Sequence, residues 1–255
     1  MFYVPESAVE KSVNQKQISD AVYDIFVQLS LCEARNFPIV REKLNYADAI
    51  FGFKSGFENK GPLLGVKAGG LWPGNAVKGI ANHQSTVVLF DPQTGSPAAL
   101  VRATYLTALR TAAASSLSIR HLARRSVKSL GILGAGGQSR FQIYAALKER
   151  DFGSVFISDK SDESAQLLAH YVRSLGYAAI VCTPKTMAQS SDVIITVVPS
   201  FAPIIKVDWV NPGTHIACMG TDTAGKQELE TELIANCSLF VDEAEQALNI
   251  GECQH

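Results

Sequence analysis

The sequence predicts an α/β protein with a doubly wound parallel sheet in its second half and an α+β domain in its first half. Three observations support this fold class. From residue 128 onward, short apolar runs alternate with stretches of helical spacing, which is typical of parallel strands joined by helices. In the first half, apolar runs are separated by Gly and Pro turns, which favours an antiparallel or mixed sheet. A glycine-rich turn joins the first strand and helix of the second half.

Length and composition limit the class of protein further. The chain has 255 residues, of which 47% are hydrophobic and 18% charged, as in folded globular proteins. Its formal net charge of −1 gives no overall attraction to nucleic acid or to an anionic membrane. No apolar run reaches the roughly 18 residues of a membrane span, and no signal peptide is evident. We therefore expect a cytoplasmic protein with neither a nucleic-acid nor a membrane partner.

The cysteines indicate neither a disulfide framework nor a metal centre. There are five of them, an odd number, and they are widely spaced without any Cys-x-x-Cys pair. We expect reduced thiols that mostly pack as small apolar groups, and no metal ligands.

The elements of the first half follow from hydrophobic spacing. A helix with one apolar face is predicted over residues 17–34, and a helix crowded with small residues over 104–122. Strands between them are expected at 49–53, 63–66 and 86–90. A polar link follows the second helix, and the expected domains are therefore 1–123 and 124–255.

The second half alternates strands and helices. Strands are predicted at 129–133, 154–158, 178–182, 192–198, 214–219 and 238–241. Helices are predicted at 138–149, 162–175, 185–190, 226–235 and 243–249. This order implies a Rossmann-type sheet.

The turn after the first of these strands has the features of a dinucleotide pyrophosphate site. Gly134 permits a tight turn, Gly136 lets phosphate oxygens approach the backbone, and small Ser139 lets the helix pack close to its strand. The helix N-terminus offers free N–H groups to the phosphates. An ordinary strand-to-helix turn is the alternative.

Asp159 ends the second strand of this half. A carboxylate there accepts hydrogen bonds from the adenosine ribose and repels a 2′-phosphate, which favours NAD(H), although neighbouring Lys160 weakens that repulsion. NADP(H) stays open as a cofactor. The alternative role for Asp159 is a helix N-cap ahead of Ser161.

Three basic residues are candidates for binding a small anion. Lys67 lies in an apolar strand, where its ammonium either reaches water or faces an anion. Arg110 is the one long side chain among small ones in its helix, which suits bidentate binding of a carboxylate; a solvated helix charge is the alternative. Arg41, after an apolar stretch, is a weaker candidate for the same anion.

Asp222 is the candidate acid or base. It follows the strand at 214–219, at the carboxyl edge of the parallel sheet where doubly wound folds keep their chemistry. Capping of the following helix is the alternative. His83 lies in a turn before a strand and is a further candidate, although most histidines in such turns are only surface residues.

With these residues placed, the chain resembles the ornithine cyclodeaminase/mu-crystallin family over nearly its whole length. The motifs that carry the resemblance are Gly65-Val-Lys-Ala-Gly, Trp72-Pro-Gly-Asn-Ala, Leu89-Phe-Asp-Pro-Gln-Thr-Gly95, Thr107-Ala-Leu-Arg-Thr-Ala-Ala-Ala-Ser115, Gly131-Ile-Leu-Gly-Ala-Gly-Gly-Gln-Ser139 and Met219-Gly-Thr-Asp-Thr-Ala-Gly-Lys226.

The resemblance implies a substrate-binding and dimerisation domain over 1–123 and an NAD(P)-binding domain over 124–255. It implies that Arg41, Lys67 and Arg110 bind the substrate carboxylate, that Lys67 and Asp222 are catalytic, and that the protein forms a homodimer. The cofactor-binding residues expected are Gly134, Gly136, Gly137, Gln138, Ser139, Asp159 and Thr111.

Two departures from the family pattern bear on activity. Bacterial ornithine cyclodeaminases carry a glutamate near the position of Gly52, whereas no acid lies between Ala49 and Phe57 here. This favours imine reduction over a substrate with two ammonium groups. Family members also continue beyond the position of Glu252 with a segment that returns to the first domain, and we expect 124–255 to lack it.

We therefore expect NAD(P)H-dependent reduction of a small cyclic imino acid, such as Δ1-pyrroline-2-carboxylate to L-proline. The alternatives are ornithine cyclodeamination to L-proline and ammonia, and a non-catalytic nucleotide-dependent ligand-binding protein of the mu-crystallin type. Linear substrates, such as pyruvate with ammonia, also stay open.

Overall fold

The computed structural model describes all residues from 1 to 255 and divides into two compact units, Met1–Arg110 and Thr111–His255. The division falls inside helix α3 (Thr104–Leu122), not after residue 123 as expected from the sequence. The reason is that the later turns of α3 contribute Ile119 to the hydrophobic core of the second unit. The roles predicted for the two domains are not decided by this division.

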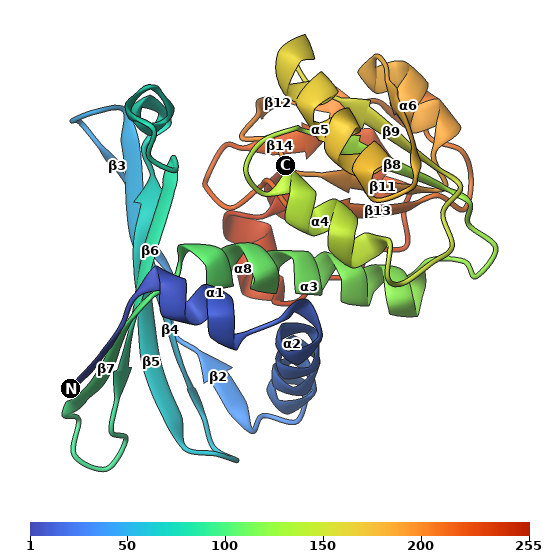
Figure 1. The fold of residues 1–255 in the computed structure, drawn as a ribbon. Helices are drawn as coiled ribbons and strands as arrows, with labels where there is room; N and C mark the ends of the chain where they lie inside the picture. Colours follow the sequence, from blue (N-terminus) through green and yellow to red (C-terminus); the bar gives the residue numbers. More distant parts are fainter. The chain divides into compact units, whose positions relative to one another are not determined.

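Unit 1 is built on a seven-stranded sheet, as expected for an α+β domain (Figure 1). The strands run in the order β1-β7-β6-β5-β4-β2, with β3 paired to β4. All neighbours are antiparallel except β1 and β7, so the sheet is mixed. The strands are β1 (Phe2–Val4), β2 (Ala34–Asn36), β3 (Val40–Leu44), β4 (Ala49–Glu58), β5 (Leu63–Leu71), β6 (His83–Phe90) and β7 (Pro97–Arg102). The helices are α1 (Glu6–Ser12), α2 (Gln15–Ser30), the 3₁₀ turn η1 (Pro73–Lys78) and the start of α3.

Helix α2 is shorter than predicted. It begins with a capping box, in which the Asn14 side chain accepts from Gln17 N–H and the Gln17 side chain accepts from Asn14 N–H. It ends at Ser30, because the chain turns and residues 34–36 pair with β4 as an edge strand. Cross-strand pairing thus replaces the last helical turn that the apolar spacing predicted.

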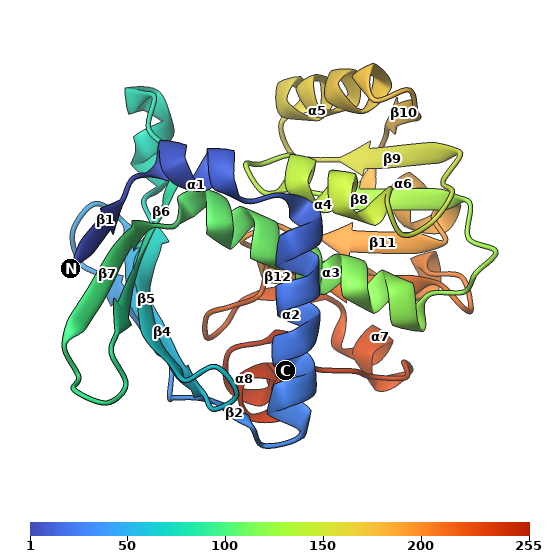
Figure 2. The ribbon, with the colours of Figure 1, turned by 60° about the horizontal axis from the view of Figure 1, so that its bottom comes forward.

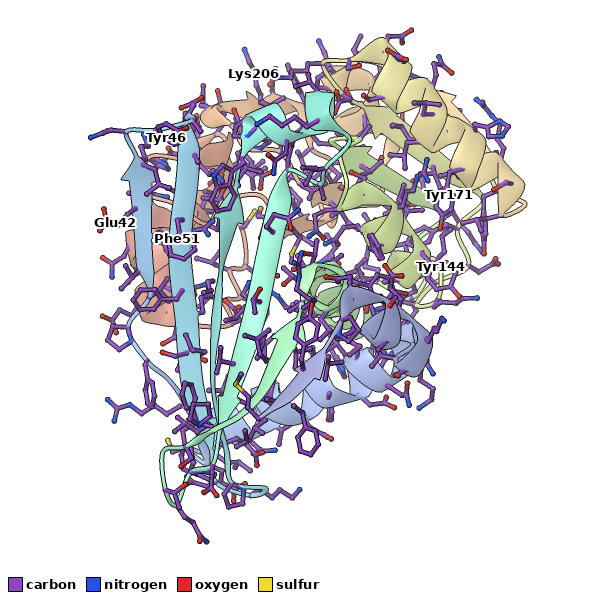
Figure 3. All side chains as sticks on the ribbon, turned by 60° about the vertical axis from the view of Figure 1, so that its left-hand side comes forward. Glu42, Tyr46, Phe51, Tyr144, Tyr171 and Lys206 are labelled. Carbon is purple, nitrogen blue, oxygen red and sulfur yellow. The ribbon has the colours of Figure 1, made fainter.

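The two faces of the unit 1 sheet differ in what they carry. We call the face with Ser85 the inner face, because Ser85 Oγ lies 2.9 Å from Thr107 Oγ1 of α3. The opposite, outer face carries partly exposed aromatic side chains, among them Phe51, which Figure 3 labels, and Phe53. Side chains of directly opposed residues project from the same face, so the strand register assigns each residue to one of the two.

Unit 2 is a Rossmann-type domain, which confirms the predicted fold class (Figure 2). Its five parallel strands run in the order β10-β9-β8-β11-β13, which is the 3-2-1-4-5 order of dinucleotide-binding sheets. The strands are β8 (Ser129–Leu133), β9 (Ser154–Ser158), β10 (Ala178–Val181), β11 (Val193–Thr196) and β13 (His215–Cys218), with a separate pair β12 (Phe201–Ile205) and β14 (Gln227–Leu229). The helices are α4 (Ser139–Ala146), α5 (Asp162–Ser174), α6 (Pro184–Ser190), α7 (Thr231–Ala235) and α8 (Ala244–Asn249), with 3₁₀ turns η2 (Val207–Trp209) and η3 (Glu252–Gln254).

Two predictions for the end of unit 2 are wrong. The strand expected at 238–241 is irregular, and its apolar side chains Leu239, Phe240 and Val241 are exposed, unlike those of a buried parallel strand. The helix expected over 226–235 is reduced to α7, because residues 227–229 instead pair with β12. No helix of the structure is long and apolar enough to cross a membrane.

Candidate functional site

The glycine turn of unit 2 has the geometry that a pyrophosphate site needs. Gly134 has a φ of 107°, and a Cβ on it would lie 2.9 Å from the carbonyl oxygen of Val197, so only glycine fits there. A Cβ on Gly136 or Gly137 would meet no heavy atom within 4 Å, so the backbone of the turn is open to a ligand. Ser139 Oγ donates to Gly134 O at 2.7 Å and fixes the start of α4 against the turn.

The residues around the turn also fit a dinucleotide. Asp159 stands at the end of β9, as predicted, and its Oδ2 accepts the N–H of Ala135 at 2.7 Å. The N-cap alternative for Asp159 is wrong, because Ser161 is itself the N-cap of α5 and Asp159 Oδ1 accepts its N–H. Gln138 Oε1 is buried without a hydrogen-bond partner, so it has an acceptor to offer a ligand. Thr111 is buried within α3.

The candidate acid, Asp222, lies beyond the carboxyl end of β13 and forms an ion pair. Lys226 Nζ lies 2.7 Å from Asp222 Oδ1, and the lysine side chain is only 7% exposed. Thr223 Oγ1 also donates to Asp222 Oδ1, at 3.1 Å. No helix begins after Asp222, so the capping alternative is wrong. Asp222 instead forms an ion pair with Lys226 four residues further on.

The fully buried carboxylate of Glu228 accepts hydrogen bonds from residues at the ends of two strands near Asp222. Glu228 accepts hydrogen bonds from Thr196 Oγ1 and Val198 N–H, both at 2.8 Å, and from Gly220 N–H at 2.9 Å. The residues that follow β11 and β13 are thus held by one side chain. Glu252 adds a second carboxylate, which accepts from the N–H groups of Glu228 and Leu229 and from Thr221 Oγ1.

Burial raises the pKa of Glu228 from 4.5 to about 7, helped by the nearby negative charge of Glu252 and opposed by the three donors. A carboxyl whose pKa is higher in the folded state stabilises the fold most at low pH, and this contribution is lost as pH rises through the folded pKa. We therefore expect the free energy of unfolding to fall between pH 4.5 and about 7 through this group.

The variant Glu228→Gln, which exchanges no proton, should lack this part of the pH dependence in urea unfolding. Glu230→Gln is the control, because its carboxylate accepts from Val207 N–H elsewhere. An equal pH slope in wild type and Glu228→Gln would show that Glu228 keeps an ordinary pKa.

Unit 1 brings two of the three predicted anion-binding residues, Arg41 and Lys67, to one face of its sheet. Arg41 stands opposite Gly52, and Gly52 stands opposite Gly69, two residues along β5 from Lys67. The register therefore puts Arg41 and Lys67 on the inner face with Ser85. Arg110 lies one helical turn beyond Thr107, which contacts Ser85, so it projects from the same side of α3.

The backbone around Gly52 excludes a side chain. A Cβ there would lie 2.1 Å from the carbonyl oxygen of Val40 and 2.8 Å from Arg41 Cδ. The Arg41 side chain thus passes over residue 52, which has no side chain of its own. A glutamate at residue 52, as the cyclodeaminase pattern would require, does not fit this backbone. His83, the first residue of β6, is partly buried on the same face opposite Leu71, and its role stays a prediction.

The chain belongs to the ornithine cyclodeaminase/mu-crystallin family, whose model matches residues 4–255. It is 42% identical to the iminosuccinate reductase of Paracoccus denitrificans over 255 residues, all of this chain and 80% of that protein. The solved structure of that reductase with NAD+ superimposes with a TM-score of 0.92, covering all of this chain and 79% of the other.

Two further solved structures are similar. The Δ1-pyrroline-2-carboxylate reductase of Thermococcus litoralis, in complex with NADH and L-proline, is 29% identical with a TM-score of 0.93, covering 99% of this chain and 79% of that one. An archaeal alanine dehydrogenase dimer with bound NAD is 31% identical, also with a TM-score of 0.93, covering 100% and 78%. The three relatives hold NAD+ or NADH, in agreement with the cofactor predicted from the glycine turn.

The residues that support the candidate site could not be predicted from local sequence pattern. Glu228, Glu252 and Lys226 are not among the residues that the sequence predicts for the site. The available signal was an acid at position 228 next to apolar Leu229, since a carboxylate in such a place must be hydrogen-bonded when buried. Its partners lie up to 32 residues away, and the sequence does not identify them.

Proposed function

We propose that the protein is an NAD-dependent reductase of small α-imino acids. The observation that carries the proposal is that one chain, 42% identical to an imino-acid reductase, has both a cationic inner face in unit 1 and a dinucleotide turn in unit 2. The inner face suits a carboxylate, and the turn suits a pyridine dinucleotide. Asp222 supplies the acid or base that reduction of a C=N bond needs.

The cofactor is held by the turn and by the strand that follows it. The N–H groups of Gly136, Gly137 and Gln138 and the N-terminus of α4 bind the pyrophosphate. Asp159 accepts from the ribose hydroxyls while its Oδ2 holds Ala135, and its charge favours NAD(H) over NADP(H). When bound, NADH supplies the hydride that the imine carbon accepts.

The substrate carboxylate is bound by Arg41, Lys67 and Arg110. Guanidinium groups bind carboxylates through paired hydrogen bonds, and the ammonium of Lys67 adds a point charge. This fixes the imine carbon in place, and positioning of this kind lowers the barrier by several kcal/mol. We assign Lys67 to catalysis as well as to binding of the carboxylate.

Asp222 acts on the proton of the imine nitrogen. An imine must carry a proton on nitrogen to accept a hydride readily, and the carboxylate stabilises that iminium or relays its proton. Lys226 orients the carboxylate through the 2.7 Å ion pair. The product is the amino acid, formed with one proton from this relay and one hydride.

Two substrates within this class are favoured by specific observations. Δ1-pyrroline-2-carboxylate, which gives L-proline, follows from the sequence and from the Thermococcus litoralis relative. Iminosuccinate is named by the Paracoccus denitrificans relative. Ornithine cyclodeamination is disfavoured, because the backbone at Gly52 has no room for the acid that would hold a second ammonium group.

The test is NADH consumption by the purified protein with three imino acids. These are Δ1-pyrroline-2-carboxylate, the imine formed from pyruvate with ammonia, and the imine formed from oxaloacetate with ammonia. Turnover of at least one of them, with formation of the matching amino acid, is expected. NADH binding without turnover of any imine would contradict the proposal and favour the non-catalytic binding protein.

We also propose that the protein is a homodimer that pairs through the outer face of the unit 1 sheet. Exposed apolar side chains gather there, and such patches on a sheet face are typical of protein interfaces (Figure 3). Those assigned to this face by the register are Tyr3, Leu44, Phe51 and Phe53. The archaeal alanine dehydrogenase relative is described as a dimer.

Replacing Phe51 and Phe53 together by aspartate should convert the dimer into monomers, because two charges would be buried unpaired in an apolar interface. Sedimentation velocity measures the change in mass. Leu167→Asp is the control, since Leu167 is 58% exposed on α5, outside this face, and should leave the dimer intact. A double variant that sediments as wild type would rule out this face as the interface.

A further inference from the structure

Two side chains of the 3₁₀ turn η3 contact the loop that carries Asp222. This loop, residues 219–226, runs from the end of β13 to the start of β14, and we call it the Asp222 loop. The two side chains are Glu252 and Gln254, and they belong with the loop to unit 2. Their hydrogen-bond partners lie up to 31 residues away in the sequence, so these contacts are part of the tertiary structure of the unit.

Glu252 holds the residue before Asp222. Its Oε2 accepts a hydrogen bond from Thr221 Oγ1, and its Oε1 accepts the N–H groups of Glu228 and Leu229 at 2.8 and 2.6 Å. Glu252 is only 9% exposed, so these three donors compensate the cost of its burial. Thr221 is thus held against β14 through one carboxyl group.

Gln254 holds the other side of the Asp222 loop. Its Oε1 accepts the N–H of Gly225 at 2.7 Å, and its Nε2 lies 3.3 and 3.4 Å from the carbonyl oxygens of Lys226 and Thr223. Gly225 has a φ of 82°, the left-handed conformation of a tight turn. One side-chain amide thus contacts the segment between Asp222 and its ion-pair partner.

The two ends of the Asp222 loop are fixed by other contacts within the same unit. Gly220 has no room for a side chain, because a Cβ there would lie 2.3 Å from a backbone carbonyl oxygen, and its N–H donates to Glu228 at 2.9 Å. At the other end Lys226 pairs with Asp222 at 2.7 Å. The side chains of η3 add their contacts between these two points, on both sides of Asp222.

We infer that Thr221, Glu252 and Gln254 are positioning residues for Asp222 in the proposed reaction. The inference rests on the proposed imino-acid reductase function and adds residues to its site. The three act through the loop, which they hold on both sides of Asp222, so that the carboxylate meets the imine nitrogen in one orientation. A displacement of about 1 Å can cost roughly 10²-fold in rate, so contacts at this distance from the chemistry affect catalysis.

The test compares wild type with Gln254→Met and Thr221→Val, which remove the hydrogen bonds and nearly preserve side-chain volume. Thr221→Ser keeps the hydroxyl and is the conservative variant. Asn249→Ala is the matched control, because the Asn249 side chain donates to the carbonyl oxygen of Glu245 within α8. Each change is also made in the Asp222→Asn background.

Three properties are measured for every variant. Initial rates with NADH and the imino acid that wild type reduces fastest give kcat and KM. Mass spectrometry follows amide hydrogen exchange in the Asp222 loop of the free protein, which reports on the contacts whether or not an imine is reduced. Thermal unfolding checks that each variant is folded.

Gln254→Met and Thr221→Val should each lower kcat roughly 10–100-fold and change KM less than about twofold, because the loop moves and the carboxylate-binding residues do not. Thr221→Ser should recover most of kcat. In the Asp222→Asn background neither change should lower kcat by more than about twofold, since the group that they position is already lost. Amide exchange in the loop should be about 2–10-fold faster in Gln254→Met, the value of one hydrogen bond. Asn249→Ala should match wild type throughout.

Full additional losses of kcat in the Asp222→Asn background would overturn the inference, because Gln254 and Thr221 would then act on something other than Asp222. Wild-type kcat in both Gln254→Met and Thr221→Val would overturn it as well. Failure of the proposed function has a different signature. If wild type reduces no imine and loop exchange still rises in Gln254→Met, the contact stands and the positioning role falls with the proposed function. Unchanged exchange in Gln254→Met would refute the contact itself.

Discussion

Replacing Asp222 by asparagine is expected to lower kcat for imine reduction about 10²–10⁴-fold, the usual contribution of a positioned acid or base. The amide cannot exchange the proton that the imine nitrogen needs, and it leaves Lys226, only 7% exposed, without its carboxylate. NADH affinity should change little, since Asp222 is not among the cofactor-binding residues. Stopped-flow absorbance gives kcat, and quenching of protein fluorescence gives the affinity for NADH.

The control for this variant is Asp208→Asn, which removes an exposed carboxylate of η2. It should keep wild-type kcat. Retention of kcat by Asp222→Asn within about threefold would exclude Asp222 as the acid or base. In that case another group must supply the proton, and Lys67, also assigned to the catalytic machinery, would be the next to test.

Replacing Arg110 by methionine is expected to raise KM for the imino acid roughly 10–100-fold, because a charge-assisted hydrogen bond to the carboxylate is lost. Arg110→Lys should lie between wild type and Arg110→Met, since an ammonium keeps the charge but not the paired geometry. Initial rates at varied imino-acid concentration provide KM, with NADH at saturation.

Arg120→Met, on the same helix, is the matched control. Arg120 forms an ion pair with Glu149 at 2.7 Å within unit 2, and its loss should leave KM unchanged. An unchanged KM in Arg110→Met would remove this residue from the carboxylate site. It would then support the alternative in which Arg110 is a solvated helix charge.

The parts of the structure that could be predicted from the sequence are those whose determinants are contiguous. The glycine turn needs a strand, Gly134 and a helix in immediate succession, and all three stand within one stretch of sequence. Asp159 can be predicted for the same reason, because it directly follows the next strand in the sequence. The alternation from residue 128 onward predicts the parallel sheet, and the apolar runs of its central strands β8 and β11 are buried on both faces.

The parts that could not be predicted depend on pairing between distant segments. Glu228 becomes a candidate only when Thr196, Val198 and Gly220 surround it. The run at 238–241 has the composition of a strand, but nothing in the sequence reveals that it stays exposed. Local pattern thus identified the cofactor turn, and tertiary pairing decided the rest of the site.

The central claim is tested most directly by the stoichiometry of NADH consumption. The purified protein is supplied with NADH and an imino acid, and in parallel with L-ornithine and catalytic NAD+, and both amino acid and ammonia are quantified. The account predicts one NADH consumed for each amino acid formed from the imine, and no ammonia from ornithine. Release of ammonia and proline from ornithine without net change in NADH would contradict it and make the protein a cyclodeaminase.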